Sequence, residues 1–233
     1  MHLCKVLASH ASPAKAEMLK KFFKTGKGQY AHGEQFLGIP VPILRRILKP
    51  FSSLAFNHID TLLKSPVHEQ RLSAVLILVG QFKTGDDQKR SKVYKFYLKN
   101  AHRINNWNLV DCSAHHIVGA HLSGKDKAVL ERLAASEVLW ERRIAMVATW
   151  HDIQKGRREP ALTIARLLLA DEHDLMRKAV GWMLREVGKR VSVSVLQDFL
   201  KQHHQAMSRT TLRCAIEHFP PQQRRTFLKG ECP

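Results

Sequence analysis

The sequence predicts an all-α protein, a superhelical solenoid of antiparallel helix pairs with a concave basic groove. Windows with apolar residues at i, i+3, i+4 and i+7 follow one another along the chain, and strand signals are nearly absent. Short breaks such as KSP, KTGDD and KGRREP separate these windows. An arginine-centred pattern also recurs at a spacing of about 35 residues, which is typical of one helix pair in a repeat protein.

Proline and short polar residues mark the expected beginnings of the helices. In chain order, we expect helices to begin after Ser12, at Pro42, near Ser53, at Pro66, at Asp86, near Asn105, at Lys125, at Glu137, at Pro160, at Asp174, near Ser192, at Ser208 and at Pro220. The Gly-rich segment from Gly26 to Pro40 is expected to be a surface loop. We expect one domain of 233 residues, with N-terminal helices and the loop in residues 1–50 and tandem helix pairs in residues 51–233.

Four segments place an arginine shortly before a small residue and an apolar run. These arginines are Arg71, Arg143, Arg177 and Arg213, separated by 72, 34 and 36 residues, so one diverged copy is expected near residue 107. Helix pairs that stack in this way line a concave surface with one repeat position. The arginines could therefore form a binding strip. Alternatively, each arginine could hold neighbouring repeats together through a preceding Asp or Glu.

The chain is strongly basic. It carries 38 Lys and Arg residues against 20 Asp and Glu residues, a formal net charge of +18. Such a charge repels itself unless an anionic partner binds it. Nucleic acid is the first candidate partner, an anionic membrane surface is the second, and a basic surface that serves only solubility is the third.

Several other classes of protein are not indicated. Cys4, Cys112, Cys214 and Cys232 show no CxxC pair or zinc-ligand spacing, which predicts reduced thiols in a cytoplasmic protein without a metal. The longest strongly apolar run, at residues 74–79, is too short to span a membrane, and the N-terminus lacks the apolar region of a signal peptide. Because no P-loop or nucleophilic triad occurs either, we expect no cofactor.

A helix from Asp174 would bury one stripe of its surface. The stripe consists of Met176, Ala179, Val180, Met183, Leu184 and Val187. Trp182 falls on the opposite side, beside Lys178, Arg185 and Lys189, where an indole could stack on a nucleotide and the cations could bind phosphates. The alternative is that Trp182 packs against an adjacent repeat and contacts Arg185 through a cation–π interaction.

The segment HRINNWNLVDCSAHH, residues 102–116, stands where the diverged copy is expected. On a helix from Asn105 the apolar stripe contains Leu109, Val110, Ser113, Ala114, Ile117 and Ala120. Trp107 and Asp111 lie four residues apart at its margin, so their side chains share one side of the helix. Asp111 could equally be an ordinary surface acid or the partner of a repeat arginine. His115 and His116 have no third metal ligand at a useful spacing, which favours packing or surface roles.

Taken together, several segments resemble the AlkD family of DNA alkylation repair enzymes, which are alkylpurine DNA glycosylases built from HEAT-like repeats. The segments are FLGIPVPILRRILK, SPVHEQRLSAVLIL, INNWNLVD, WERRIAM and KAVGWMLREVGKR. The resemblance implies that Trp107 and Trp182 contact the deoxyribose of the damaged nucleotide. It also implies that Asp111 is the catalytic carboxylate and that Arg143 beside it engages the DNA backbone.

Two residues depart from the family pattern. Asn108 stands where many relatives have an Asp, and Phe22 stands where some have a Tyr, which removes a hydroxyl group. Some relatives have lost key site residues and bind DNA without excising bases. Because this chain keeps all four residues, the resemblance implies an active enzyme.

The expected activity is hydrolysis of the N-glycosidic bond of cationic 3-methyladenine and 7-methylguanine in duplex DNA, without base flipping. The expected partner is double-stranded DNA with alkylated bases, bound by a monomer that associates with the nucleoid. The further DNA-binding residues we expect are Arg45, Arg71, Arg177, Lys178, Arg185, Lys189 and Arg213. One alternative is a non-catalytic HEAT-like module that binds damaged or branched DNA. Another is a scaffold that binds a peptide, for which the concave arginines should be neutralised by repeat acids such as Glu69 and Glu141.

Overall fold

The computed structural model describes residues 2–231, so Cys232 lies outside the described residues. These residues form helices joined by turns, and their only β pairing is an isolated bridge between Gln35 and Val67. The predicted all-α fold class is therefore confirmed. The chain divides into two compact units, Met1–Ser113 and Ala114–Pro233.

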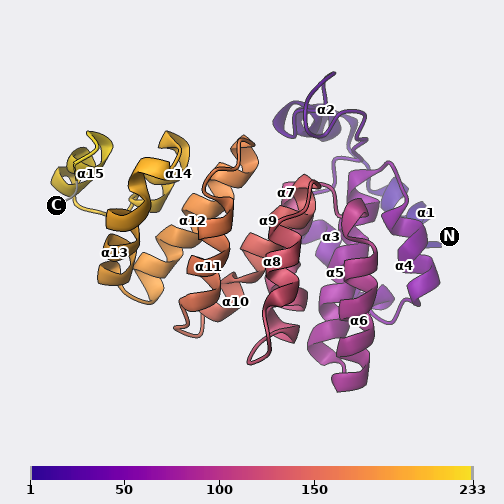
Figure 1. Cartoon of the computed structure of the whole chain (residues 1–233). Helices are drawn as coiled ribbons and strands as arrows, with labels where there is room; N and C mark the ends of the chain where they lie inside the picture. The colour runs from indigo at the N-terminus through magenta and orange to yellow at the C-terminus, as the bar shows by residue number, and fades with distance from the viewer. Residues whose placement is uncertain (1, 232–233) are drawn as a thin grey trace. The chain divides into compact units, whose positions relative to one another are not determined.

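The first unit is built around helix α5. Its elements are α1 (His2–Ser9), α2 (Pro13–Phe22), α3 (Val41–Leu48), η1 (Lys49–Phe51), α4 (Phe56–Leu63), α5 (His68–Thr84), α6 (Asp87–Lys99), η2 (Ala101–Arg103) and α7 (Trp107–Asp111). Helix α5 packs against α3, α4, α6 and α7, and α4, α5 and α6 lie side by side (Figure 1). Most α5 side chains are buried, including Leu72, Val75 and Leu78, because neighbours cover the helix on several sides.

The second unit is a series of packed helices. Its elements are η3 (His115–Gly119), α8 (Ala128–Ala134), α9 (Leu139–Ala148), α10 (Trp150–Ile153), α11 (Glu159–Leu168), α12 (Asp174–Arg190), α13 (Val193–His203), η4 (His204–Ala206), α14 (Arg209–Ala215) and α15 (Pro221–Leu228). Helix α8 packs on α9, α11 packs on α12, and α12 also contacts α13 and α14 (Figure 1). A Cβ atom at Gly181 would lie 2.6 Å from the Cβ of Cys214, so glycine permits the close approach of α12 and α14.

Most predicted helix beginnings agree with the structure within a few residues. Ser12, Asp86, Ser192 and Ser208 directly precede helices, and the Asp86 and Ser208 side chains accept hydrogen bonds from backbone N–H groups of the first turn. The apolar stripe predicted for α12 is buried in full. The sequence interpretation missed α1 and the short α10.

The predicted continuous helix from Asn105 is wrong. Helix α7 ends at Asp111, and the chain turns at Cys112 and Ser113 before the π-helical segment η3. The side chains predicted for the stripe are nevertheless buried from Leu109 to Ile117, so the apolar positions were correct although the helix is interrupted. A π-helical turn inside a helix is often found at a functional site.

The predicted loop from Gly26 to Pro40 is confirmed as irregular chain. The Glu69 carboxylate accepts hydrogen bonds from the backbone N–H groups of Leu37, Gly38 and Ile39, at 2.9, 2.7 and 3.2 Å. Gly38 has a φ of +80°, and a Cβ atom there would lie 2.3 Å from the Ser12 carbonyl oxygen. The loop is therefore held against α5 by one buried carboxylate and requires glycine at this turn. Within residues 2–231, no helix combines the length and apolar character needed to cross a membrane.

Candidate functional site

Trp107 is held in an aromatic cluster of the first unit. Its ring stacks on Phe23 with the centroids 5.2 Å apart and meets the edge of Phe22 at 5.9 Å. The indole Nε1 group donates a hydrogen bond of 3.0 Å to the hydroxyl oxygen of Tyr30. Trp107 is half-buried, as its predicted position at the margin of the apolar stripe requires. The hydroxyl group that Phe22 lacks is thus supplied near Trp107 by Tyr30, which the sequence interpretation did not identify.

The loop residue Glu34 connects this cluster to α5 and α7. Its buried carboxylate pairs with the guanidinium of Arg71 and accepts hydrogen bonds of 2.6 Å from His68 Nδ1 and Asn106 Nδ2. Asn106 is fully buried and directly precedes Trp107. The network therefore fixes the start of α7, and with it the backbone that carries Trp107.

Arg71 has a structural environment. Its side chain is buried, pairs with Glu34 and donates from Nη1 to the Ser65 carbonyl oxygen at 2.7 Å. Burial lowers the pKa of Arg71, and the charges of Glu34 and Glu69 oppose that effect. This geometry favours the alternative in which Arg71 holds the fold together over a role in binding DNA.

The departure at Asn108 has a physical explanation. When the imidazole of His68 carries one ring proton and donates it from Nδ1 to the Glu34 carboxylate, Nε2 keeps a lone pair. The amide Nδ2 of Asn108 lies 2.9 Å from that nitrogen and can donate to it. An Asp at this position could only accept, and so would require a protonated imidazole. Asn108 therefore suits a neutral His68.

Asp111 closes α7 one turn after Trp107 and is partly exposed. Burial raises the pKa of the adjacent Cys112 thiol to about 12, and the negative charge of Asp111 adds to the shift. Arg45 opposes that shift, so its exposed guanidinium acts electrostatically on the same end of α7. The pair predicted from the spacing of Trp107 and Asp111 is thus a half-buried indole and a partly exposed carboxylate.

An apolar cavity of about 600 Å³ lies beside Trp107. Its lining includes Met18, Phe22, Val41 and Asn108, and the side chains of Met18 and Phe22 are 70% and 62% exposed. The aromatic cluster is therefore open to solvent on one side.

In the second unit, Trp182 forms an indole pair with Trp150. The ring centroids are 6.0 Å apart, and the Arg190 guanidinium lies 4.7 Å from the centroid of the Trp150 ring. Trp182 therefore packs against a neighbouring helix, as the alternative interpretation predicted, but the cation–π contact with Arg185 that it also predicted is wrong. Arg185 instead binds Glu186 and Glu217, at 3.1 and 2.5 Å.

The cations predicted to bind DNA differ in whether their side chains already bind other protein groups. Lys178 pairs with Asp174 at 2.7 Å, and Arg177 donates to the Asp171 carbonyl oxygen at 3.1 Å. Arg45, Lys189 and Arg213 are exposed. These three are the predicted cations that are most accessible to a phosphate.

The arginine repeat has a different register from the predicted one. Three arginines donate a hydrogen bond to the backbone carbonyl oxygen of the residue six positions earlier. The side-chain oxygen of that earlier residue, a Ser or an Asp, accepts a hydrogen bond from the backbone N–H group two positions after it. The pairs are Arg71 with Ser65, Arg142 with Ser136 and Arg177 with Asp171, at 2.7, 2.9 and 3.1 Å. Arg142, and not Arg143, is therefore the equivalent of Arg71.

Glu69 and Glu141, two acids that could neutralise the repeat arginines, also bind other groups. Glu69 binds the loop backbone, and Glu141 accepts from the Ser136 hydroxyl at 2.6 Å. Glu34 neutralises Arg71, and Asp171 binds Arg142 Nε at 2.7 Å. Arg71 and Arg142 are thus neutralised, as the scaffold alternative requires, and the acids that pair with them are Glu34 and Asp171.

Arg143 occupies the next helical position. It is 5% exposed, and its Nη1 group donates to the Leu175 carbonyl oxygen at 2.5 Å. It is the fifth residue of α9, as Asp111 is the fifth residue of α7. The fourth residue of α7 is the buried Val110. Asp111 therefore stands at the position of Arg143, rather than at that of the repeat arginine.

The fold and these clusters define a basic all-α protein with aromatic and charged side chains set on successive helices. Residues 3–219 match the model of the DNA alkylation repair enzyme family, and the chain belongs to this family. It is thus an enzyme of DNA repair, with DNA as its partner.

A solved structure supports the fold. It is described as a predicted DNA alkylation repair enzyme from Enterococcus faecalis and superposes with a TM-score of 0.70 at 16% sequence identity. The match covers 91% of this chain and 98% of that one. A search of curated proteins gives no match.

Proposed function

We propose that this protein is an alkylpurine DNA N-glycosylase that releases 3-methyladenine and 7-methylguanine from duplex DNA. The observation that carries the proposal is the placement of Trp107 and Asp111 one turn apart on α7, the indole clamped by Phe23 and Tyr30 and the carboxylate partly exposed. An aromatic face and a carboxylate on one side of a helix can both bind a cationic nucleotide, the first through a cation–π contact and the second through its negative charge.

The reaction requires little general-acid catalysis from the protein. Alkylation makes the base cationic, so the bond between C1′ and the purine nitrogen can break with its electron pair moving to the base. Asp111 would stabilise the positive charge that develops on the sugar and orient a water molecule whose oxygen adds to C1′. The water proton leaves to solvent through the carboxylate. The products are the free base and an abasic site.

Trp107 supplies binding rather than proton transfer. A cation over an indole face is stabilised by about 0.5–2 kcal/mol, so a cationic nucleotide is favoured over a normal one. Because the indole Nε1 group is bound to Tyr30, the ring plane is fixed before DNA arrives. Such preorganisation reduces the entropy that binding must overcome.

In the second unit, Trp182 is proposed to contact a deoxyribose and Arg143 the DNA backbone, as the family resemblance implies. The recurrence of one capping and arginine pattern in α5, α9 and α12 supports the HEAT-like repeat arrangement. Arg45, Lys178, Lys189 and Arg213 would contribute phosphate contacts along a groove, and the base would stay stacked in the duplex.

The test is base release by Asp111→Asn. Methylnitrosourea-treated DNA is incubated with the protein, and released bases are identified by chromatography. Loss of the charge is expected to slow release of 7-methylguanine by at least about 100-fold, the usual effect of removing one stabilising group. Affinity for DNA should stay within a few-fold.

The matched control is Asp87→Asn, because the Asp87 side chain is fully exposed on α6. It should release base at the wild-type rate. Unchanged release by Asp111→Asn would remove Asp111 from the chemistry. A wild-type protein that binds methylated DNA and releases no base would instead identify the non-catalytic module.

A further inference from the structure

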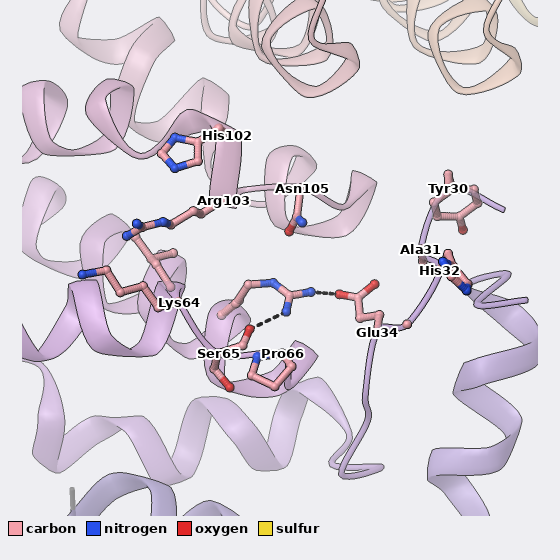
Figure 2. Close-up of a pocket in the computed structure, with 13 residues that line it drawn as sticks. Tyr30, Ala31, His32, Glu34, Lys64, Ser65, Pro66, His102, Arg103 and Asn105 are labelled. Carbon is pink, nitrogen blue, oxygen red and sulfur yellow. Dashed lines mark hydrogen bonds and ion pairs between the residues drawn. The ribbon is translucent and has the colours of Figure 1, made fainter. Parts of the chain in front are cut away.

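A polar cavity of about 490 Å³ lies within the first unit, and neither Trp107 nor Asp111 lines it. Its walls are the loop around Glu34, the turn of Lys64, Ser65 and Pro66 before α5, and the segment from His102 to Asn105 (Figure 2). Cationic side chains from separate parts of the chain meet around it. The cavity has the size and polarity of a site for a small anionic group.

Only part of the Arg103 guanidinium is hydrogen-bonded to other protein groups. Its Nη1 atom lies 3.1 Å from Asp60 Oδ1 and 3.4 Å from Asn100 Oδ1. Within residues 2–231 its Nε and Nη2 groups have no hydrogen-bond partner, and the side chain is 30% exposed. Two donors of the guanidinium fork are therefore available to a bidentate acceptor such as a phosphate.

Lys64 is the second available cation. Its Nζ atom binds Asp60 Oδ2 at 2.5 Å, and its side chain is 54% exposed. Figure 2 shows Lys64 and Arg103 together on one wall, with His102 beside them. An ammonium group carries three donors, so Lys64 can bind Asp60 and a further acceptor at once.

The positive charge on this wall exceeds the negative charge. Asp60 is the one carboxylate among Lys64, Lys99, His102 and Arg103 in the adjoining cavity of about 400 Å³. A hydrogen bond from Lys64 and the charges of Lys64, Arg103 and Lys99 lower the pKa of Asp60. Glu34, which lines the cavity of about 490 Å³, is already bound by Arg71, and the dashed lines in Figure 2 end at Glu34 and Ser65.

One buried donor also lacks a protein partner. Arg71 lines the cavity at 5% exposure, and its buried Nε atom has no hydrogen-bond partner in the described part of the chain. An unpaired buried donor is costly unless a ligand or a water satisfies it. This observation is independent of the surface charges.

We propose that this cavity binds a phosphodiester group of the DNA, with Arg103 and Lys64 as its ligands. The proposal rests on the proposed function and adds a contact to it. Tyr30 lines the cavity and accepts the hydrogen bond of Trp107, and Asn105 lies two residues before Trp107. The bound phosphate therefore belongs to the DNA near the nucleotide that Trp107 holds.

The test measures the affinity for a short unmodified duplex as a function of NaCl concentration, with Arg103→Gln and Lys64→Gln. Each phosphate contact adds about 0.9 to the slope of log K against log salt, so each variant should lose about that amount. Between about 50 and 200 mM salt, the advantage of the wild type should shrink about 3.5-fold. Lys83→Gln is the matched control, since this exposed lysine lies about 18 Å along α5 from Arg71.

Asp60→Asn is expected to change the DNA affinity in the opposite direction. Removing the carboxylate frees Arg103 and Lys64, so the variant should bind the duplex more tightly and with a steeper salt slope. A variant that simply folds poorly cannot bind more tightly, and a melting curve for each variant records its folding. Arg103→Lys should keep the slope, because it keeps the charge.

The outcomes separate this inference from the proposed function. Base release that persists, with salt slopes unchanged in both Gln variants and no tightening in Asp60→Asn, overturns the inference alone. A reduced slope in a protein that releases no base supports the inference and removes the glycosylase activity. If inorganic phosphate raises the melting temperature through Arg103 while DNA slopes do not change, the cavity binds a free anion and the DNA contact is overturned.

Discussion

Replacing Glu34 by Ala should destabilise the protein strongly. The carboxylate and its partners Arg71 and His68 have side chains 5%, 7% and 3% exposed. Removing one member of a buried ion pair leaves an uncompensated charge and costs about 3–5 kcal/mol. For a chain of this size, about 2–4 °C of melting temperature is lost per kcal/mol, so the expected decrease is about 6–20 °C. Thermal unfolding followed by circular dichroism measures it.

Glu17→Ala is the control for this prediction. Glu17 pairs with Lys20 at 2.6 Å, but the two side chains are 66% and 43% exposed. An exposed pair contributes at most about 1 kcal/mol, so the melting temperature should fall by less than about 4 °C. Adding Arg71→Met to Glu34→Ala should recover part of the loss, because no buried charge then remains unpaired. Equal decreases for Glu17→Ala and Glu34→Ala would refute the reasoning that the Glu34 network holds the loop and α7.

Two further predictions concern the second unit. Arg142→Met should lower the melting temperature without changing the salt slope of DNA binding, whereas Arg143→Met should reduce that slope by about 0.9; equal slopes for Arg143→Met and wild type would make Arg143 structural. Burial lowers the pKa of His173 below its ordinary 6.5; the charges of Asp171 and Asp174 oppose this shift, and those of Arg142 and Arg143 add to it. The unfolded state therefore binds more protons, and stability is lost as the pH falls below about 6.5. His173→Asn keeps an acceptor for the backbone N–H of Leu175, and should lose less stability between pH 7.5 and 5.5 than wild type; identical losses would contradict this.

Features that depend on local chemistry were predictable from the sequence. Asp86 and Ser208 mark helix beginnings with side chains that cap the first turn, and Ser12 and Ser192 directly precede helices without a side-chain cap hydrogen bond. The buried stripe of α12 follows from a period of 3.6 residues, which needs no knowledge of the partner helix. The Gly-rich loop was predictable too, because glycines disfavour helix in the residues next to them whatever distant segments they contact.

Features that depend on distant residues were not. Glu34 is 37 positions from Arg71 and 72 from Asn106, and no spacing in the sequence links them. The register of the repeat arginine was missed by one residue, because Arg142 and Arg143 are adjacent and only the contact with Ser136 distinguishes them. A signal was present in the sequence: Ser65, Ser136 and Asp171 each stand six positions before an arginine.

The corrected register bears on where function can arise. At the fourth residue of α5, α9 and α12 the side chain is an arginine bound to the carbonyl six residues earlier, so that position is committed to the fold. The fifth residue is turned about 100° from it around the helix and differs from one helix to the next. It is Leu72, Asp111, Arg143, Lys178 and Arg213 in α5, α7, α9, α12 and α14. The proposed catalytic carboxylate and three of the proposed DNA-binding cations thus stand at one repeat position whose residue type changes from helix to helix, although Arg143 there also donates to the Leu175 carbonyl oxygen. Substitutions at the fourth position should therefore alter stability, and substitutions at the fifth from Asp111 onward should alter catalysis or DNA binding.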